Sequence, residues 1–168
     1  MKIRIIGPCG SGKSTLAREL SLRYDIPFYE IDNLIWDRSA DQRKFPEADR
    51  DAKLRSILSS DSWIVEGVQY KDWTLGTIEK ADLIFLLKPH VLKRDLWIIK
   101  RFMLSRTGIR PWNYKQSFGN LCKMMVRWNH QYEIEAVTGL IEKYRKTSFV
   151  VRNKAEVIRE IEKFNESV

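Results

Sequence analysis

A stretch near the start of the chain combines glycines, a lysine and hydroxyl side chains in the spacing G-x-x-x-x-G-K-[ST]. Its residues are Gly7, Pro8, Cys9, Gly10, Ser11, Gly12, Lys13, Ser14 and Thr15. Glycines adopt backbone angles that let successive N–H groups point at phosphate oxygens. Lys13 would reach the β- and γ-phosphates and act in catalysis, and the Ser14 hydroxyl would ligate Mg²⁺. The pattern predicts a site for ATP and Mg²⁺; a glycine-rich turn that binds nothing is the alternative.

The sequence on either side of this loop supplies the context that the motif requires. Residues 2–6 are typical of a short strand, and residues 14–24 place apolar side chains among charged ones as a helix does. A strand, a loop and a helix in this order distinguish a phosphate loop from a chance match. The start of the helix would add its positive dipole end to the site.

Two acidic residues are expected near the loop, because each follows a short apolar strand. Asp32 comes after the predicted strand 28–31, and Glu66 comes after the predicted strand 63–65. Ligands of a parallel sheet gather at the carboxyl ends of its strands, the edge that also carries the loop. Asp32 is therefore a candidate catalytic residue that would bind the acceptor and orient or deprotonate its hydroxyl. An aspartate that caps a turn or a helix is the alternative.

Glu66 has two candidate roles at the same edge. It could hold the shell of Mg²⁺ through water, or it could hydrogen-bond a substrate hydroxyl. A strand-end carboxylate with neither role is the alternative. Gly67, which follows it, would let a substrate come close to the backbone.

Positive charge is concentrated in one part of the chain. The formal net charge is +8, and residues 88–127 hold ten basic residues against one acidic residue, Asp95. Such a block suits a bound polyphosphate, a second anionic substrate or nucleic acid. A solvated helix face is the alternative.

Four arginines of this block are candidates for phosphate binding. Arg94 and Arg101 are seven residues apart on a predicted helix and so lie on one face, and Arg106 and Arg110 follow. Arginines on a closing segment stabilise a phosphoryl group in transfer and exclude water. We expect a lid at about residues 94–116, with Arg101 and Arg106 catalytic and with Arg94 and Arg110 in contact with substrate.

The tryptophans divide between the predicted core and the predicted acceptor side. Trp63 and Trp97 lie in core-like patterns, and we expect both to be buried. Trp36 falls on the acceptor side, which we place at about residues 32–60, and it could stack on a base or a sugar. Packing is the alternative role for Trp36. His90 and His130 are isolated and belong to no metal-ligand pattern.

Short apolar strands alternate with helices, which predicts an α/β domain over residues 1–168 with a parallel sheet between two helical layers. The expected strands are 2–6, 28–31, 63–65, 82–87 and 148–151. The expected helices are 14–24, 47–59, 73–79, 91–103, 118–144 with an interruption at Gly139 as an option, and 154–164.

Composition narrows the class of protein further. No apolar run approaches the length of a membrane span, so we expect no membrane partner. The two cysteines, Cys9 and Cys122, have neither the number nor the spacing of a disulfide framework or a metal site. A reducing cytoplasm is the expected location.

Across nearly its whole length the sequence resembles the small P-loop kinases of the adenylate-kinase and shikimate-kinase type. Within that group it most resembles the topology modulation proteins. The resemblance is carried by the phosphate loop and by residues 32–36, 63–70, 81–86, 93–97, 100–101 and 106–111. It implies a five-stranded parallel sheet in the order 2-3-1-4-5, an arginine-bearing lid, a mobile acceptor region, and the use of ATP and Mg²⁺.

Two departures from the family pattern concern the acceptor side. The chain reads Glu66-Gly67-Val68-Gln69-Tyr70 where Asp-Gly-Asn-Tyr is usual, and we count Tyr70 among the substrate-binding residues. The Asp-Gly-Phe-Pro-Arg signature of adenylate kinases is missing from the sequence. AMP is therefore not the expected acceptor.

The leading hypothesis is an ATP-dependent phosphotransferase that moves the γ-phosphate to a small acceptor, as nucleoside, nucleotide and small-metabolite kinases do. The alternative is an ATP-binding regulator of DNA topology that binds DNA through its basic segment. The family name suggests that alternative, but the sequence contains no recognised nucleic-acid module. A degenerate fold that binds ATP without chemistry is a third, weaker option. The pattern specifies neither the acceptor nor an oligomeric state.

Overall fold

The computed structural model of the protein describes residues 1–37, 43–70, 72–107 and 118–167. The strands are β1 (Lys2–Ile6), β2 (Phe28–Glu30), β3 (Trp63–Gly67), β4 (Leu83–Leu87) and β5 (Ser148–Val151). The α-helices are α1 (Lys13–Tyr24), α2 (Ile31–Ile35), α3 (Glu47–Ser59), α4 (Leu75–Glu79), α5 (Val91–Thr107), α6 (Phe118–Met125), α7 (Ile134–Lys143) and α8 (Lys154–Ser167). A 3₁₀ turn, η1 (Asp72–Thr74), precedes α4, and a π-helical turn, η2 (Val126–His130), follows α6.

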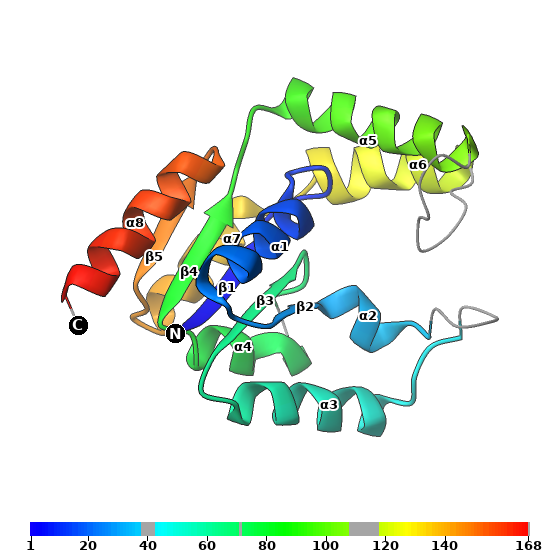
Figure 1. The fold of residues 1–168 in the computed structure, drawn as a ribbon. Helices are drawn as coiled ribbons and strands as arrows, with labels where there is room; N and C mark the ends of the chain where they lie inside the picture. The colour runs from blue at the N-terminus through cyan, green and yellow to red at the C-terminus, as the bar shows by residue number, and fades with distance from the viewer. Residues whose placement is uncertain (38–42, 71, 108–117, 168) are drawn as a thin grey trace.

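The strands form one parallel sheet in the order β2-β3-β1-β4-β5, which confirms the predicted fold class and strand order (Figure 1). The central strand β1 pairs with β3 on one side and with β4 on the other. Glu66 of β3 is in register with Ile5 of β1 and with Glu30 of β2. The carboxyl ends of β2, β3 and β1 therefore meet along one edge of the sheet.

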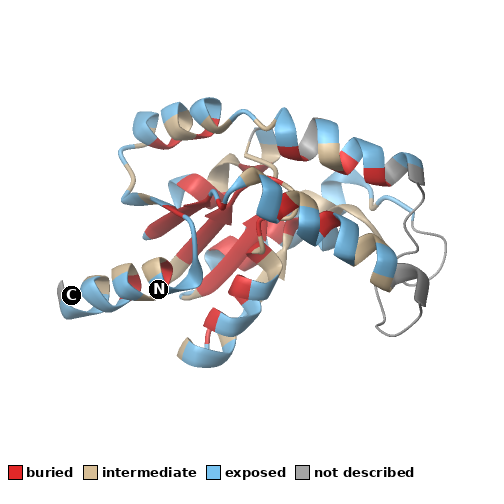
Figure 2. Ribbon diagram, turned by 90° about the horizontal axis from the view of Figure 1, so that it is seen from above, coloured by how far each residue is buried: buried red, intermediate tan, exposed pale blue. Residues whose placement is uncertain are grey.

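Helices pack on both faces of the sheet, so its strands are buried on two sides (Figure 2). On one face, α1 and α8 pack onto the sheet through side chains such as Leu20 and Ile161. On the other face, α3, α4 and α7 pack through side chains such as Leu54, Ile78 and Val137. This burial explains why the strands are almost continuously apolar in sequence.

The two tryptophans expected in the core have different environments. Trp63 is fully buried, as predicted, but Trp97 is 40 % exposed, so that prediction is wrong. Helix α5 buries Arg94 and Ile98 instead. Helical spacing identifies residues that share one face of a helix, but it does not tell which face packs against the rest of the protein.

The long helix predicted over residues 118–144 is in fact two helices. Helix α6 ends at Met125 and continues as the π-helical turn η2, and α7 begins only at Ile134. The optional break at Gly139 is wrong, since that glycine lies inside α7 with open space around its Cα. The contacts of η2 give a physical reason for the real break: Asn129 and His130 both bond to the carboxylate of Asp95 on α5.

The predicted strand before Asp32 is shorter than expected. Strand β2 ends at Glu30, and residues 31–35 form the short helix α2, so Asp32 lies in a helical first turn and not at a strand end. The buried side chains of Ile31 and Leu34 hold this helix against the core. Asp32 nevertheless stays close to the same edge of the sheet, because β2 is in register with β3.

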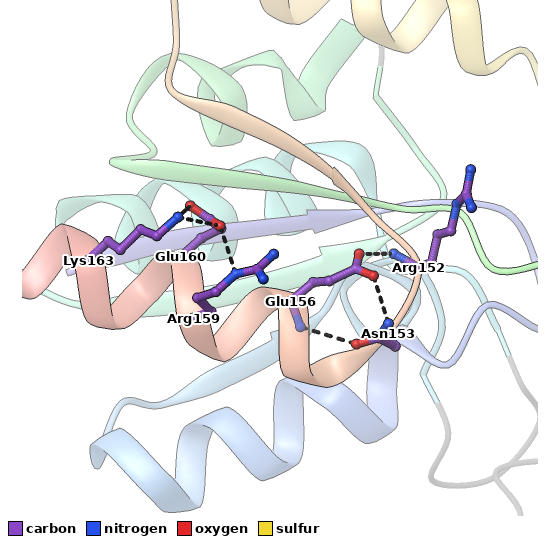
Figure 3. A network of polar contacts seen from close by, with 6 residues as sticks. All are labelled: Arg152, Asn153, Glu156, Arg159, Glu160 and Lys163. Atoms are coloured by element: carbon purple, nitrogen blue, oxygen red, sulfur yellow. Dashed lines mark hydrogen bonds and ion pairs between the residues drawn. The ribbon is translucent and has the colours of Figure 1, made fainter.

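Helix α8 starts at a network of polar contacts that fixes its position after β5 (Figure 3). The side-chain oxygen Oδ1 of Asn153 accepts a hydrogen bond from the main-chain N–H of Glu156 at 3.1 Å, and the Glu156 carboxylate accepts one from the main-chain N–H of Arg152 at 2.7 Å. Reciprocal bonds of this kind satisfy the free N–H groups at a helix start. The Arg152 side chain points away from this network.

Parts of two predicted segments lie outside the described residues. The first part of the predicted lid, residues 94–107, belongs to α5, and residues 108–116 lie outside. In the predicted acceptor region, residues 38–42 also lie outside. None of the helices in the described ranges combines the length and the apolar character that crossing a bilayer requires.

Candidate functional site

The phosphate loop joins β1 to α1 and has a backbone that requires glycine at more than one position. Gly10 and Gly12 have φ angles of +73° and +91°. A Cβ at Gly10 would lie 2.7 Å from the main-chain oxygen of Arg94 and 2.8 Å from Cγ1 of Ile98. Conformation and space both exclude a side chain there. The glycines therefore let α5 pack directly against the loop, at the start of α1.

The Lys13 side chain lies inside the loop and is 8 % exposed. Its Nζ donates hydrogen bonds to the main-chain oxygen of Pro8 at 2.8 Å and to Oγ of Ser11 at 3.3 Å. Burial lowers the pKa of this ammonium, and the nearby Glu66 carboxylate partly opposes that effect. A phosphate in the loop would favour the charged form, because an anion compensates a buried cation.

Ser14 and Glu66 are joined by a direct hydrogen bond. Oγ of Ser14 donates to Oε1 of Glu66 at 2.7 Å, and Glu66 is 5 % exposed. No three His, Cys, Asp or Glu side chains in the described part of the chain are clustered so that they could hold a metal alone. A hydroxyl and a carboxylate beside a phosphate loop fit Mg²⁺, which prefers oxygen ligands, keeps several waters and takes others from phosphates.

Burial raises the pKa of the Glu66 carboxyl, although Lys13 and Ser14 act in the opposite direction. A carboxyl whose pKa is higher in the folded than in the unfolded protein holds its proton more tightly when folded. Its contribution to stability is therefore lost as pH rises from the ordinary pKa of 4.5 through the raised value. Above pH 4.5 the burial of this carboxyl therefore reduces the stability of the folded protein.

Glu66→Gln is therefore expected to raise the melting temperature of the protein without nucleotide at pH 7, by about 2–4 °C for each kcal/mol relieved. The gain should disappear at pH 4, where glutamate is protonated. Melting curves of both proteins from pH 4 to pH 8 test this expectation. Glu19→Gln is the control, because Glu19 lies on α1, is half-exposed and pairs with Lys154 of α8. A melting temperature for Glu66→Gln at or below that of the parent protein at pH 7 would contradict it.

Helix α5 lies directly against the phosphate loop. Ile98 and the main chain of Arg94 contact Gly10, and a Cβ at Gly12 would lie 3.0 Å from Cζ3 of the Trp97 ring. Nη2 of Arg101 lies 3.9 Å from Sγ of Cys9 in the loop and 3.4 Å from Sδ of Met124. The structure thus brings the Arg101 side chain and the main chain of Arg94 to the loop.

Arg94 is a buried cation with free hydrogen-bonding capacity. Only 7 % of the residue is exposed, and its Nε and Nη1 have no hydrogen-bond partner among the described residues. Burial lowers its pKa, which the neighbouring Asp95 partly offsets. A buried guanidinium without partners is costly, so an anion beside it would be stabilising. Of the other predicted arginines, Arg106 belongs to α5 and Arg110 lies outside the described residues.

Asp32 is exposed and is bonded to a residue that the sequence patterns did not single out. Nε2 of Gln69 donates to Oδ1 of Asp32 at 3.0 Å. Gly67 packs closely against both neighbours, since a Cβ there would lie 2.9 Å from Cβ of Ile31 and 3.0 Å from Oε1 of Gln69. Asp32 and Glu66 are thus near enough to interact electrostatically, and Asp32 adds to the raised pKa of Glu66.

Tyr70 and Trp36 occupy different parts of the acceptor side. The Tyr70 hydroxyl donates to Oε2 of Glu133 at 3.1 Å, and its ring stands edge-on to Tyr132 at 6.0 Å. A shallow hollow of about 220 Å³ lies beside it, lined by Gln69, Tyr70, Asp72 and Trp73. Trp36 lies at the start of the loop before α3, where the Lys44 ammonium stands over its ring at 5.2 Å. The structure places Tyr70, but not Trp36, at this hollow.

The sequence patterns assign no role to Arg4, Gln69 or Tyr132. The guanidinium of Arg4 donates to the main-chain oxygen of Gln69, and the Tyr132 hydroxyl donates to the main-chain oxygen of Val68 at 3.0 Å. One signal for Arg4 was available in the sequence: a charged residue in the middle of a strand that is otherwise apolar. Nothing in the sequence pairs Tyr132 with residues 68–70, because that contact depends on the position of α7.

A parallel sheet in this order, with a glycine-rich loop and a buried lysine after its central strand, is the fold of the P-loop kinases. Among solved structures the chain matches shikimate kinase from Acinetobacter baumannii, which was solved in complex with shikimate. The TM-score is 0.58 at 14 % sequence identity, over 99 % of this chain and 93 % of that chain. No protein-family model and no curated protein matches the sequence. The likeness establishes the fold, and the resemblance to topology modulation proteins stays a prediction.

Proposed function

We propose that the protein is an ATP-dependent phosphotransferase that transfers the γ-phosphate to a small acceptor. The observation that carries the proposal is the position of Asp32. It lies at the edge of the sheet that holds the phosphate loop, two residues beyond Glu30, which is in register with Glu66. A carboxylate at this place can receive the proton of an acceptor hydroxyl, which P-loop enzymes that only hydrolyse a triphosphate do not need.

The donor side of the site would be formed by the loop and by α5. Residues 7–15 would hold the polyphosphate through main-chain N–H groups, with Lys13 at the β- and γ-phosphates. Ser14 and Glu66 would hold Mg²⁺, Glu66 through water, and the ion would neutralise charge on the phosphates. Arg94 and Arg101 would supply the further cations that a phosphoryl group in transfer requires. The burial of Arg94 and the contact of Arg101 with Cys9 in the loop support that role.

The acceptor side would extend from α2 across the loop after β3. Asp32 would orient the acceptor hydroxyl, and Gly67 and Tyr70 would line its site. Trp36 is proposed as a further wall, together with the rest of residues 32–60. Residues 94–116, with Arg106 and Arg110, are proposed as the lid that excludes water during transfer.

The alternative, a DNA-binding regulator, has less support from the structure. Within the basic block, the Arg101 side chain contacts Cys9 of the phosphate loop and the Arg94 side chain is buried, so neither is well placed to bind a DNA backbone. The exposed lysines of the block, such as Lys93 and Lys100, remain for that purpose. DNA binding through them would weaken steeply with added salt. A gel-shift series at two salt concentrations, with and without ATP, separates this alternative from the phosphotransferase.

An acceptor screen tests the proposed function. The panel should contain nucleosides, nucleoside monophosphates, sugars and hydroxy acids including shikimate, each added to the protein with ATP and Mg²⁺. We expect at least one compound to raise ADP release well above the rate with ATP alone, and to appear as a phosphorylated product by mass spectrometry. If every compound leaves the rate at the level of ATP alone, the proposed function is wrong.

A further inference from the structure

Arg4 is a fully buried arginine in the central strand of the sheet. Its neighbours Ile3, Ile5 and Ile6 are apolar, as expected for a strand that is covered on both faces. Burial lowers the pKa of the guanidinium to about 10, so Arg4 still carries its charge at neutral pH. A leucine or methionine would fit such a position without the cost of burying a charge. The contacts of Arg4 must therefore explain why an arginine serves here.

All the hydrogen-bond partners of Arg4 in the described part of the chain are main-chain oxygens. Nη1 donates to Ile5 at 2.9 Å and to Val65 at 3.1 Å, and both of these partners belong to strands. Nη2 donates to Gln69, in the loop that follows β3. Nε is buried and has no partner among the described residues. Only the bond to Gln69 reaches beyond the sheet.

The loop that Arg4 reaches is held from more than one side. The Tyr132 hydroxyl binds the main-chain oxygen of Val68, and the Tyr70 hydroxyl binds Glu133. These contacts fix the residues before and after Gln69 to the start of α7. Arg4 binds the main-chain oxygen of Gln69 itself. The Gln69 side chain extends to Asp32, with a distance of 3.0 Å from Nε2 of Gln69 to Oδ1 of Asp32.

We propose that Arg4 is a positioning residue: it fixes the main chain of Gln69 so that the Gln69 amide orients the Asp32 carboxylate toward the acceptor. The effect of Arg4 on turnover rests on the proposed function, whereas the anchoring of the Gln69 main chain by Arg4 does not. Misplacement of a catalytic group by about 1 Å can reduce a rate a hundredfold, so a residue that never touches the acceptor can control turnover.

Hydrogen exchange measured by mass spectrometry tests the anchoring of the loop without any acceptor. In Arg4→Met, the peptide that contains Val68, Gln69 and Tyr70 is expected to exchange at least tenfold faster than in the parent protein, because a loop that loses its anchor opens more often. Peptides from β4 and α8 should change by less than twofold. The matched control is Arg23→Met, which removes an exposed arginine that pairs with Glu162 on α8.

Kinetics test the effect on the reaction, with the acceptor found in the screen. Arg4→Met is expected to lower kcat about 10–100-fold while the KM for ATP stays within twofold. Gln69→Leu, which removes the amide at a partly exposed position, should lower kcat by a similar factor. The double variant should be no worse than the more impaired single variant, since both changes break one chain of contacts.

Several results would overturn the inference. One is a loop that exchanges at the parental rate in folded Arg4→Met. Others are fast exchange with unchanged kcat, a rise in the KM for ATP that matches the loss of kcat, or additive effects of the two substitutions. If Arg4→Met does not fold, Arg4→Lys replaces it, because lysine keeps the charge but lacks the planar fork that reaches three oxygens. If no acceptor supports turnover, the proposed function fails, and the exchange result still decides the anchoring.

Discussion

Replacement of Lys13 by methionine is expected to lower kcat for phosphoryl transfer by at least about a hundredfold and to leave the protein folded. The Lys13 ammonium is buried in the loop and is bonded to Pro8 and Ser11. Methionine keeps most of the length of the side chain but brings no charge to the developing negative charge of the transferred group. Since burial disfavours the ammonium, as its lowered pKa indicates, its removal should not unfold the protein.

A coupled assay of ADP release at saturating ATP measures the fall in kcat, and calorimetric titration measures the affinity of each protein for ATP. Lys154→Met is the matched control, because Lys154 is an exposed lysine that pairs with Glu19 at 3.0 Å and lies away from the loop. The control should retain parental turnover and ATP affinity. Turnover of Lys13→Met within threefold of the parent would show that the loop does not act as proposed.

The second large effect is expected for Asp32→Asn, which should lower acceptor-dependent turnover about 10²–10⁴-fold, the range of a lost general base. Asparagine has the shape of aspartate, and its carbonyl oxygen can still accept the hydrogen bond from Gln69. It lacks only the charge and the capacity to take a proton. The KM for ATP and the slow hydrolysis of ATP without acceptor should therefore remain within about twofold.

The two rates are separated by measuring ADP release with and without acceptor. Asp61→Asn is the control, since Asp61 is an exposed aspartate in the turn before β3. Parental acceptor turnover in Asp32→Asn would remove Asp32 from the mechanism. A parallel loss of ATP binding would instead assign Asp32 to the donor side of the site.

The sheet and the phosphate loop could be predicted because each depends on short stretches of sequence. Buried parallel strands are apolar on both faces, so strands such as β3 and β4 are visible as apolar runs. The loop motif places its glycines and Lys13 within a few residues of one another. The resemblance to P-loop kinases then supplied the strand order, which no local pattern specifies.

The parts that could not be predicted depend on contacts between distant segments. The spacing predicts Trp97 in the core, but α5 turns Arg94 and Ile98 inward, where Ile98 packs against Gly10 of the phosphate loop. The break before α7 depends on Asp95, more than thirty residues before the π-helical turn that binds it. Asp32 was assigned to a strand end because Ile31 is as apolar as a strand residue, although it begins a helix.

The candidate site shows the same division between local and distant signals. Ser14 and Glu66 were predicted singly, and the structure adds the bond between them. The contacts of Gln69 with Asp32 and with Arg4 arise from a loop that joins two layers of the fold. No spacing rule covers such a loop, because its path is set by residues from both layers.

The central place of β1 in the sheet has a consequence for how the protein reaches its native state. Lys2 pairs with Trp63 and Ile3 pairs with Leu83, so neither neighbour of the first strand is close to it in sequence. Pairings over such distances are slow to form, because long loops must close before any contact stabilises them. During synthesis, the phosphate loop is complete long before the strands that flank β1 have left the ribosome. The folded phosphate loop, and with it the proposed nucleotide binding, should therefore appear late in folding, although its residues are made before those two strands.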